Sequence, residues 1–273
     1  EARKSLFQKV GVITKEITGN FVMLCRIARY DYKLLNKDSY LGKAWSILTP
    51  LLQIAVYWLV FGMGIRSGRD VDGHPFLLWM LCGLVPWFFM NHSITSGASS
   101  IYRKAGVVTK MRYPISTVPI GVIVTGWLEH VMVLLILFIT LLAHGYLPTV
   151  HYLNLIYYMM FSFVFLSSLA LITSVLTMLA RDFEKVLANV VRLLFYITPI
   201  LWSMDKMPET YQQFSKANPI YYVVTGFRES ILYDMDFWKH PLRIIFFWTL
   251  NFVRFVVGCN LQYKYRKKFS DLV

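Results

Sequence analysis

Long apolar stretches separated by short charged segments dominate the pattern of this chain. From His130 to Ala180 the sequence contains no Asp, Glu, Lys or Arg. A helix needs about 20 apolar residues to cross a bilayer, so this stretch is long enough for two crossings. The turn that two crossings require is present between His144 and Pro148. The pattern therefore predicts a helical protein that crosses a membrane several times.

We expect an all-α, polytopic protein whose transmembrane domain covers residues 44–263. Each predicted span is an apolar run that is bounded by charged or turn residues. The six predicted spans cover about residues 44–65, 76–102, 113–143, 151–180, 186–203 and 241–263. Pro50 and Pro86 lie inside two of these spans, where a proline kinks or breaks a helix.

Residues 1–43 precede the first span and predict an amphipathic helix that lies along the membrane surface. Apolar residues recur at steps of three and four between positions 5 and 36, and basic residues lie between them. The apolar positions are Leu6, Val10, Ile13, Ile17, Phe21, Leu24 and Ala28. Two roles are open for this helix, an anchor on the membrane or a docking face for a cytoplasmic partner.

The segment 204–240, between the last two spans, is too apolar for an ordinary loop and too short to cross the membrane. Asn218 followed by Pro219 predicts a helix start, with an N-cap and a first helical residue. A second short helix is expected to begin near Pro208. We interpret the segment as two re-entrant half-helices in the outer leaflet, which is possible where protein buries the backbone.

The chain is 56% hydrophobic, and its net charge is +13. Most of its 28 Lys and Arg residues lie in four segments, 1–43, 103–112, 181–185 and 264–268. These segments alternate along the chain with loops that hold fewer cations, so the positive-inside rule places both termini in the cytoplasm, including the tail 264–273. Because topology accounts for the basic charge, no nucleic-acid partner is expected.

Motifs for enzymatic chemistry are absent from the sequence. The Gly42–Lys43 pair has Lys37 where the first glycine of a nucleotide-binding loop should be, so the chain is not expected to hydrolyse nucleotides. The sequence has neither an HExxH motif nor a Cys/His spacing for zinc. No catalytic, cofactor-binding or metal site is therefore predicted.

Three charged residues inside the predicted spans are candidate functional residues, namely Glu129, Arg192 and Arg254. A charge within a bilayer is costly and usually faces a protein interior or a water-filled path. Glu129 fits either a hydrogen bond between helices or a role in transport. The two arginines fit either snorkelling to the inner headgroups or a cationic lining for an anionic substrate.

The segment 103–112 is basic and contains no acidic residue. Its cations are Arg103, Lys104, Lys110 and Arg112. A loop that obeys the positive-inside rule explains this charge. The short, partly apolar sequence also suits a small helix that docks on a partner.

Several segments along the chain form a recognisable set of motifs, namely Tyr40–Trp45 leading to Pro50, Gly83–Phe89, Lys110–Pro114, Arg181–Phe183 with Tyr196–Trp202, and Asn218–Arg228. Together they resemble the motifs of ABC-2 type polysaccharide-export permeases. Within this family, three further segments are most similar to permeases that translocate wall teichoic acid, namely Gln53–Trp58, Phe76–Leu81 and Pro199–Asp205.

The resemblance implies a half-transporter in the bacterial plasma membrane. A homodimer of this permease would pair with two copies of a separate ABC ATPase subunit, which binds ATP and Mg²⁺, while this chain holds no cofactor. The complex would move undecaprenyl-diphosphate-linked wall teichoic acid from the cytoplasm to the outer face of the membrane. The alternative substrate is another lipid-linked polysaccharide, of the O-antigen or capsule type.

The resemblance also assigns residues to roles. Spans 1 and 5 of both copies line the path in this family, and Glu129 and Arg254 join it as intramembrane charges. The expected path residues are Tyr57, Trp58, Glu129, Arg192, Tyr196 and Arg254. The ATPase is expected to dock on Phe21, Arg26, Arg29, Arg103, Lys104, Lys110 and Arg112.

Two other classes of protein are less consistent with the sequence. An ion-gradient-driven transporter could use Glu129 and His130 as a proton relay, but the basic N-terminus and the lack of paired acids argue against it. A membrane enzyme usually has a cluster of acids or histidines at an interface. The predicted outer acids are dispersed, at Asp205, Glu209, Glu229, Asp234 and Asp236. We therefore expect a transport subunit and not an enzyme.

Overall fold

The computed structural model describes residues 5–34, 37, 39–65, 68–110, 114–204 and 207–271. These parts of the chain are almost entirely helical, which confirms the all-α prediction. They contain α1 (Leu6–Gly19), α2 (Phe21–Leu34), α3 (Trp45–Tyr57), α4 (Phe76–Lys110), α5 (Thr117–Ala143), α6 (Asn154–Leu179), α7 (Asp182–Ile197), α8 (Glu209–Lys216), α9 (Pro219–Ile231) and α10 (Pro241–Asp271). Helix α3 continues directly into a π-helical segment, Trp58–Ile65.

Five helical segments in the described ranges are long and apolar enough to cross a membrane. They are Trp45–Ile65, Phe76–Lys104, Thr117–Ala143, Val150–Leu179 and Pro241–Arg266. Each coincides with one of the predicted spans. Neither Pro50 nor Pro86 breaks its helix, since both lie inside continuous α-helices.

The remaining predicted span, 186–203, is wrong in its bounds. Helix α7 begins earlier, at Asp182, and ends at Ile197 after 16 residues. Its length of about 24 Å is shorter than a hydrocarbon core of about 30 Å. The helix ends because Thr198 precedes Pro199 and adopts an extended backbone, with φ −76° and ψ 135°.

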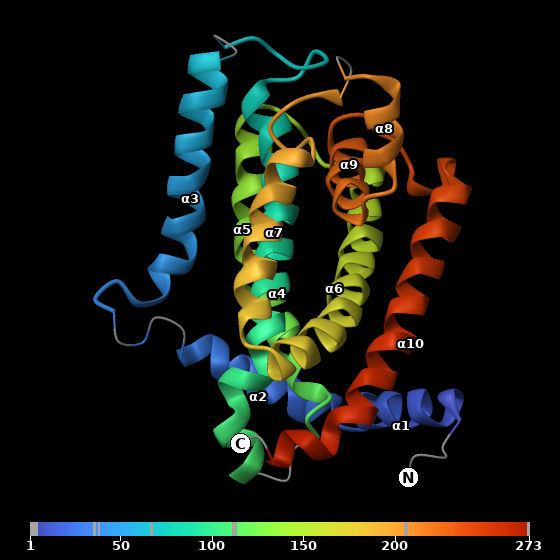
Figure 1. Ribbon diagram of the computed structural model, residues 1–273. Coiled ribbons are helices and arrows are strands. Elements are labelled where there is room, and N and C mark those ends of the chain that lie inside the picture. The colour runs from blue at the N-terminus through green and yellow to red at the C-terminus, as the bar shows by residue number, and fades with distance from the viewer. Residues whose placement is uncertain are drawn as a thin grey trace.

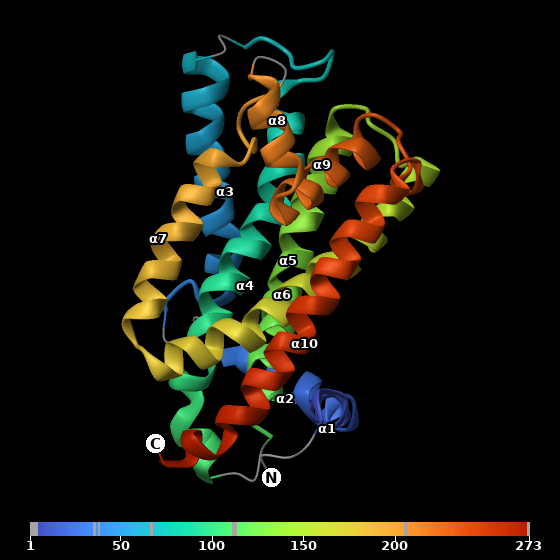
Figure 2. The ribbon, with the colours of Figure 1, turned by 45° about the vertical axis from the view of Figure 1, so that its right-hand side comes forward.

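The long helices alternate in direction along the chain (Figure 1). Helices α3, α5 and α7 run away from the end of the bundle that carries the N- and C-termini, and α4, α6 and α10 run back toward it (Figures 1 and 2). We call this end the terminal end. Helix α7 runs in the same direction as α3 and α5, toward the end that carries α8 and α9, but it covers only part of the height of the bundle (Figures 1 and 2). Helices α8 and α9 lie at the opposite end.

Helix α4 forms the centre of the bundle. Of the most apolar part of its candidate span, 78% is buried, whereas the share is 11% for the span that begins with α3 and 22% for α10. Small residues allow close contact between the helices around it. A Cβ atom on Gly97 of α4 would lie 2.9 Å from the Cβ atom of Ala170 on α6, and one on Gly258 of α10 would lie 2.8 Å from the Cβ atom of Leu171. Helices α3 and α10 are left at the edges of the bundle.

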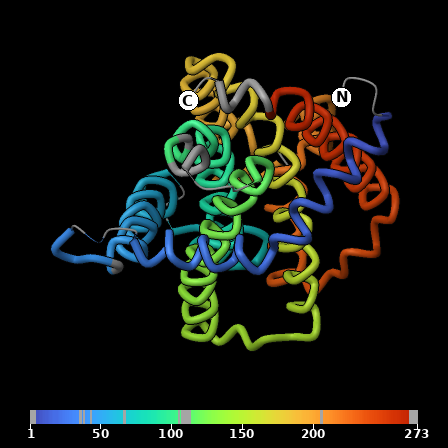
Figure 3. Tube along the Cα trace, turned by 90° about the horizontal axis from the view of Figure 1, so that it is seen from below, coloured from blue at the N-terminus to red at the C-terminus, as the bar shows by residue number. Residues whose placement is uncertain are grey.

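The N-terminal segment forms two helices and not the single helix that the pattern predicts. Helix α1 ends at Gly19, and the Asn20 side chain donates a hydrogen bond to the carbonyl oxygen of Glu16 at 2.8 Å. The two helices cross the terminal end of the bundle (Figure 3). Ile13 and Leu24 are buried against residues of α5, α6 and α10. Part of the predicted apolar face therefore packs on the protein itself.

The helices of the segment 204–240 begin where the sequence predicts. Helix α8 starts at Glu209, directly after Pro208. The Asn218 side chain accepts a hydrogen bond from the backbone N–H of Ile220 at 2.9 Å, so Asn218 is the N-cap of α9 and Pro219 its first residue.

A polar cluster joins the start of α6 to the connection between α9 and α10. The Asp236 carboxylate lies 2.8 Å from Nδ1 of His151 and accepts a hydrogen bond from Nδ2 of Asn154 at 3.1 Å. The hydrogen bond from Asn154, together with His151, lowers the pKa of Asp236 below its ordinary value of 3.8. The ionised carboxylate therefore stabilises the fold at neutral pH.

Acidification is expected to remove this contribution. A carboxyl group whose pKa is lowered by folding stabilises the protein above its ordinary pKa, and the stabilisation is lost as the pH falls through the folded pKa. We expect the thermal unfolding midpoint of the purified protein to fall below pH 3.8. The Asp236→Asn variant should have a lower midpoint at neutral pH and a smaller fall in acid. An identical acid response in both proteins would contradict the assignment.

Candidate functional site: a polar pocket between α3, α4 and α5

A pocket of about 480 Å³ lies between the first half of α3 and the middle of α4 and α5. Its α3 residues, from Trp45 to Gln53, come from the end of α3 that faces the terminal end of the bundle (Figure 1). The pocket thus extends from that side toward mid-depth. It is lined by Ser39, Trp45, Ser46, Thr49, Pro50, Gln53, Phe88, Phe89, Asn91, His92, Gly126, Glu129, His130 and Val133.

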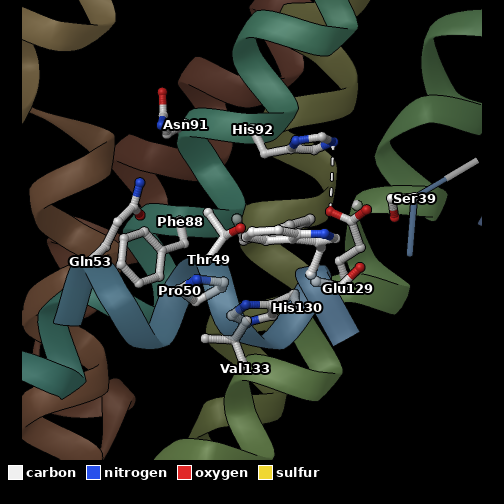
Figure 4. Close-up of a pocket in the computed structure, with 14 residues that line it drawn as sticks. Ser39, Thr49, Pro50, Gln53, Phe88, Asn91, His92, Glu129, His130 and Val133 are labelled. Carbon is white, nitrogen blue, oxygen red and sulfur yellow. Dashed lines mark ion pairs between the residues drawn. The ribbon is translucent and has the colours of Figure 1, made fainter. Parts of the chain in front are cut away.

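Glu129 lies on α5, 12 positions after the helix starts at Thr117, which is about 18 Å along the helix. Its Oε2 atom lies 3.9 Å from Nε2 of His92 on α4 (Figure 4). The two groups form an ion pair when His92 is protonated. Both side chains are partly exposed to the pocket, at 24% for Glu129 and 43% for His92. A ligand in the pocket can therefore reach the carboxylate.

His130 is a second polar group at the pocket, and it is only 3% exposed. Its ring stacks on Phe89 with the ring centroids 4.9 Å apart. Its Nδ1 atom is buried and has no hydrogen-bond partner within the described part of the chain. A buried polar atom without a partner is destabilising, and a bound polar ligand is one means of satisfying it.

Amide and hydroxyl groups complete the polar lining. Figure 4 shows Asn91 and Gln53 on one side of the pocket and Glu129 and Ser39 on the other. Aromatic rings of Trp45, Phe88 and Phe89 lie among these groups. Hydrogen-bonding side chains mixed with ring faces suit a ligand that has both hydroxyl groups and apolar C–H surfaces, as a sugar does.

Of the six predicted path residues, only Glu129 lines this pocket. Tyr57 of α3 contacts Phe195 of α7, with ring centroids 5.3 Å apart. Trp58 is 40% exposed and Tyr196 is 63% exposed. Arg192 is also exposed on α7. These four residues thus belong to the α3 and α7 side of the bundle.

Arg254 lies apart from the other predicted path residues. It is on α10, and its guanidinium carbon lies 5.1 Å from the ring centroid of Phe165 on α6. Its Nη1 atom is buried and has no hydrogen-bond partner in the described ranges. The expectation that Arg192 and Arg254 line one path therefore has no support within a single copy.

The predicted docking residues fall into three groups. Arg103 forms an ion pair with Glu184 of α7 at 3.1 Å, and Lys104 forms one with Asp31 of α2. These pairs connect the last part of α4 to α7 and α2. Phe21, Arg26 and Arg29 are exposed on α2. The side chain of Lys110 and the whole of Arg112 lie outside the described residues.

Sequence reasoning placed Arg228 in a re-entrant helix of the segment 204–240 and missed its structural role. Arg228 on α9 is 5% exposed. Its guanidinium donates hydrogen bonds to the carbonyl oxygens of Pro199 at 2.8 Å, Ile200 at 2.6 Å and Trp79 at 3.3 Å. It also lies 3.4 Å from the ring centroid of Trp79. The signal in the sequence was an arginine on an apolar helical face, directly after Phe227.

Sequence reasoning also missed most of the pocket. His92, Asn91 and Gln53 lie inside apolar spans and share no motif with Glu129. The one available signal was that polar residues within spans tend to face a protein interior.

A bundle of apolar helices around a polar pocket is the architecture of a membrane transport protein. The chain belongs to the ABC-2 type transporter family, whose conserved domain matches residues 24–232. The matched domain is a membrane permease, which is a transport subunit that lacks an ATPase domain. Membership in the family implies a partner ATPase subunit.

Several permeases of polysaccharide export are similar to this chain. The O-antigen export system permease protein RfbA of Myxococcus xanthus is 28% identical over 214 residues, which cover 78% of this chain and 80% of that protein. RfbA of Klebsiella pneumoniae is 25% identical over 254 residues, which cover 93% and 95%. The polysialic acid transport protein KpsM of Escherichia coli is 22% identical over 193 residues, which cover 70% and 74%.

Proposed function

We propose that this chain is the permease subunit of an ABC exporter that moves a lipid-linked polysaccharide outward across the bacterial plasma membrane. The similarity to permeases named for O-antigen and polysialic acid supports a polysaccharide substrate. The observation that carries the proposal is the polar pocket between α3, α4 and α5, because its mixed hydrogen-bonding and aromatic lining suits sugar units.

The charge of the pocket favours a neutral glycan, such as an O-antigen type. Among the 14 described residues that line it, Glu129 is the one acidic side chain, and none is Lys or Arg. A carboxylate accepts hydrogen bonds from sugar hydroxyl groups but repels the phosphates of a polyanion. The alternative in our sequence analysis, a lipid-linked polysaccharide other than teichoic acid, is therefore the better supported substrate.

Wall teichoic acid is the second candidate, and one observation favours it. Arg192 is exposed on α7, beside the exposed Tyr196, and a cation on this face can pair with phosphates of a polymer that passes along α7. Arg254 contributes to such a path only if it is rearranged, because it contacts Phe165 on another helix.

A homodimer accounts for the uncovered side of α3 and α7. Large apolar side chains on this side are more than half exposed, including Val56, Leu59 and Leu193. We propose that a second copy faces this side across the substrate path, which places Tyr57, Trp58, Arg192 and Tyr196 along that path. The terminal end then faces the cytoplasm, in agreement with its many Lys and Arg residues.

We propose that the partner ATPase docks at the terminal end, on α2 and the last turns of α4. Arg26 is exposed there, and the Arg103–Glu184 and Lys104–Asp31 pairs connect this surface to α7 and α2. Through these pairs, a movement of the ATPase can be passed to the helix that carries Arg192.

The test is ATP hydrolysis by the permease reconstituted with its ATPase partner. We expect a neutral-glycan diphospholipid to stimulate hydrolysis more strongly than a diphospholipid that carries a teichoic-acid-type polymer. The Arg192→Leu variant should respond to the neutral glycan as the wild type does. A selective response to the anionic polymer that is lost in Arg192→Leu would instead support wall teichoic acid. Robust hydrolysis by the permease alone would exclude both.

A further inference from the structure

An apolar groove lies on the opposite face of α5 from the polar pocket. Its volume is about 540 Å³, within the range of about 300–1,000 Å³ that is common for small-molecule sites. It is formed by Phe21, Cys25 and Arg29 of α2, Val124, Trp127 and Leu128 of α5, and Ile156, Met159, Met160, Phe163 and Val164 of α6.

The groove and the pocket are separate sites. With about 3.6 residues per turn, Val124 and Leu128 point to one side of α5, whereas Glu129, His130 and Val133 point to the other. The two sites have no lining residue in common. The groove is therefore independent of the site that we propose for sugar units.

One side of the groove is open at the surface of the protein. Phe21 is 48% exposed, Ile156 is 59% exposed and Met160 is 61% exposed. Helix α2 crosses the bundle beneath α5 and α6, at the terminal end (Figure 3). The groove thus begins at the level of α2 and continues between two apolar spans. Flexible Met159 and Met160 allow its wall to adapt to a chain of variable shape.

Of the described residues that line this groove, Arg29 is the only charged one. It is exposed and forms no ion pair with any residue in the described part of the chain. A cation at one end of an apolar groove matches an amphiphile with an anionic head and a hydrocarbon tail. Arg29 lies on α2 at the terminal end, and the apolar wall is formed by the membrane-spanning candidates α5 and α6.

We propose that the groove is a binding site for an anionic phospholipid, with one acyl chain between α5 and α6 and its phosphate at Arg29. The bound lipid would fill the space that α2 leaves against α5 and α6. It would thereby connect the N-terminal helices to the membrane-spanning bundle. The site requires neither the exported polymer nor a second copy of the chain.

Cys25 provides a direct measurement, because it lines the groove while Cys82 and Cys259 are fully buried. The permease with its ATPase partner is placed in bilayers of phosphatidylcholine alone or with phosphatidylglycerol, and maleimide labelling of Cys25 is timed. We expect phosphatidylglycerol to slow the labelling about fivefold, the factor that one cation contributes at an anionic membrane surface. The Arg29→Gln variant should lose this difference.

The matched control is Lys15→Gln, which removes an exposed cation from the neighbouring helix α1, outside both the groove and the proposed docking surface. This variant should keep the protection by phosphatidylglycerol. Native mass spectrometry of the detergent-extracted complex supplies a second readout, in which retained phosphatidylglycerol should decrease in Arg29→Gln and not in Lys15→Gln. Equal labelling and retention in all variants would overturn the proposal. Protection by a polyprenyl phosphate but not by phosphatidylglycerol would also overturn it, in favour of the substrate's own anchor.

Discussion

Replacing Arg228 with Met is expected to lower the free energy of unfolding by about 3–5 kcal/mol. The substitution leaves the carbonyl oxygens of Pro199 and Ile200 without the guanidinium donor. Buried acceptors without a donor are destabilising by about 1–3 kcal/mol each. The contact with the Trp79 ring is lost as well. The measurement is the temperature at which the purified protein loses its monodisperse peak in size-exclusion chromatography.

The stabilisation depends on the planar guanidinium, which lysine lacks. Arg228→Lys should therefore be more stable than Arg228→Met but less stable than the wild type. The matched control is Arg69→Met, which removes an exposed cation. It should leave the unfolding temperature unchanged. A drop for Arg69→Met as large as the drop for Arg228→Met would show that net charge, and not the hydrogen-bond network, is responsible.

Gly83 provides an independent check of this network. A Cβ atom at Gly83 would lie 2.7 Å from Nη2 of Arg228, so Gly83→Ala should displace the guanidinium and destabilise the protein. In the Arg228→Met background the same change should be less destabilising, because the atom that it meets is gone. If the destabilisation of the double variant equals the sum of the destabilisations by Gly83→Ala and Arg228→Met, the two residues act separately.

Replacing Glu129 with Gln is expected to reduce transport of a neutral lipid-linked glycan about 10-fold or more. A hydrogen bond to a charged group contributes about 1.5–3 kcal/mol, and the amide that replaces the carboxylate provides a weaker acceptor for sugar hydroxyl groups. The complex should still assemble, because Gln has nearly the same size and shape as Glu. The assay is appearance of the glycan on the far side of vesicles that contain the complete transporter.

The outcome distinguishes a binding role from a purely structural one. If Glu129 only holds α5 to α4 through His92, Gln is expected to preserve both assembly and transport. Glu209→Gln on the exposed surface of α8 is the matched control and should transport normally. Normal transport by Glu129→Gln as well would remove the pocket from the proposed function.

Much of the fold could be predicted, because a single long apolar run in a bilayer can form all its backbone hydrogen bonds only as a helix. Local chemistry predicted the start of α9 as well, because Asn218 caps the helix and Pro219 fits its first position. The prediction from apolar runs was less accurate at α7, where the extended backbone before Pro199 ends the helix although the apolar sequence continues. It was also less accurate at Asn20, because a periodic pattern does not show a change of direction between two helices.

The candidate site could be predicted only in part. Glu129 stood out because an acid in an apolar span is rare. His92, Gln53 and Asn91 are uncharged polar residues on other helices, and only the packing of α3 against α4 and α5 brings them to Glu129. In the same way, Arg103 and Lys104 resembled unpaired docking cations until the fold placed Glu184 and Asp31 beside them.

The sequence by itself determined the class of this protein. Its apolar runs, its asymmetric Lys and Arg residues and its missing nucleotide-binding loop indicate a helical membrane permease, because each is a property of a continuous segment. Only the tertiary structure decided which polar groups meet. The hydrogen bonds of Arg228, the pocket around Glu129 and the groove at Arg29 each combine residues from at least three separated segments. Such contacts follow from how helices rotate and cross, which hydropathy alone does not specify.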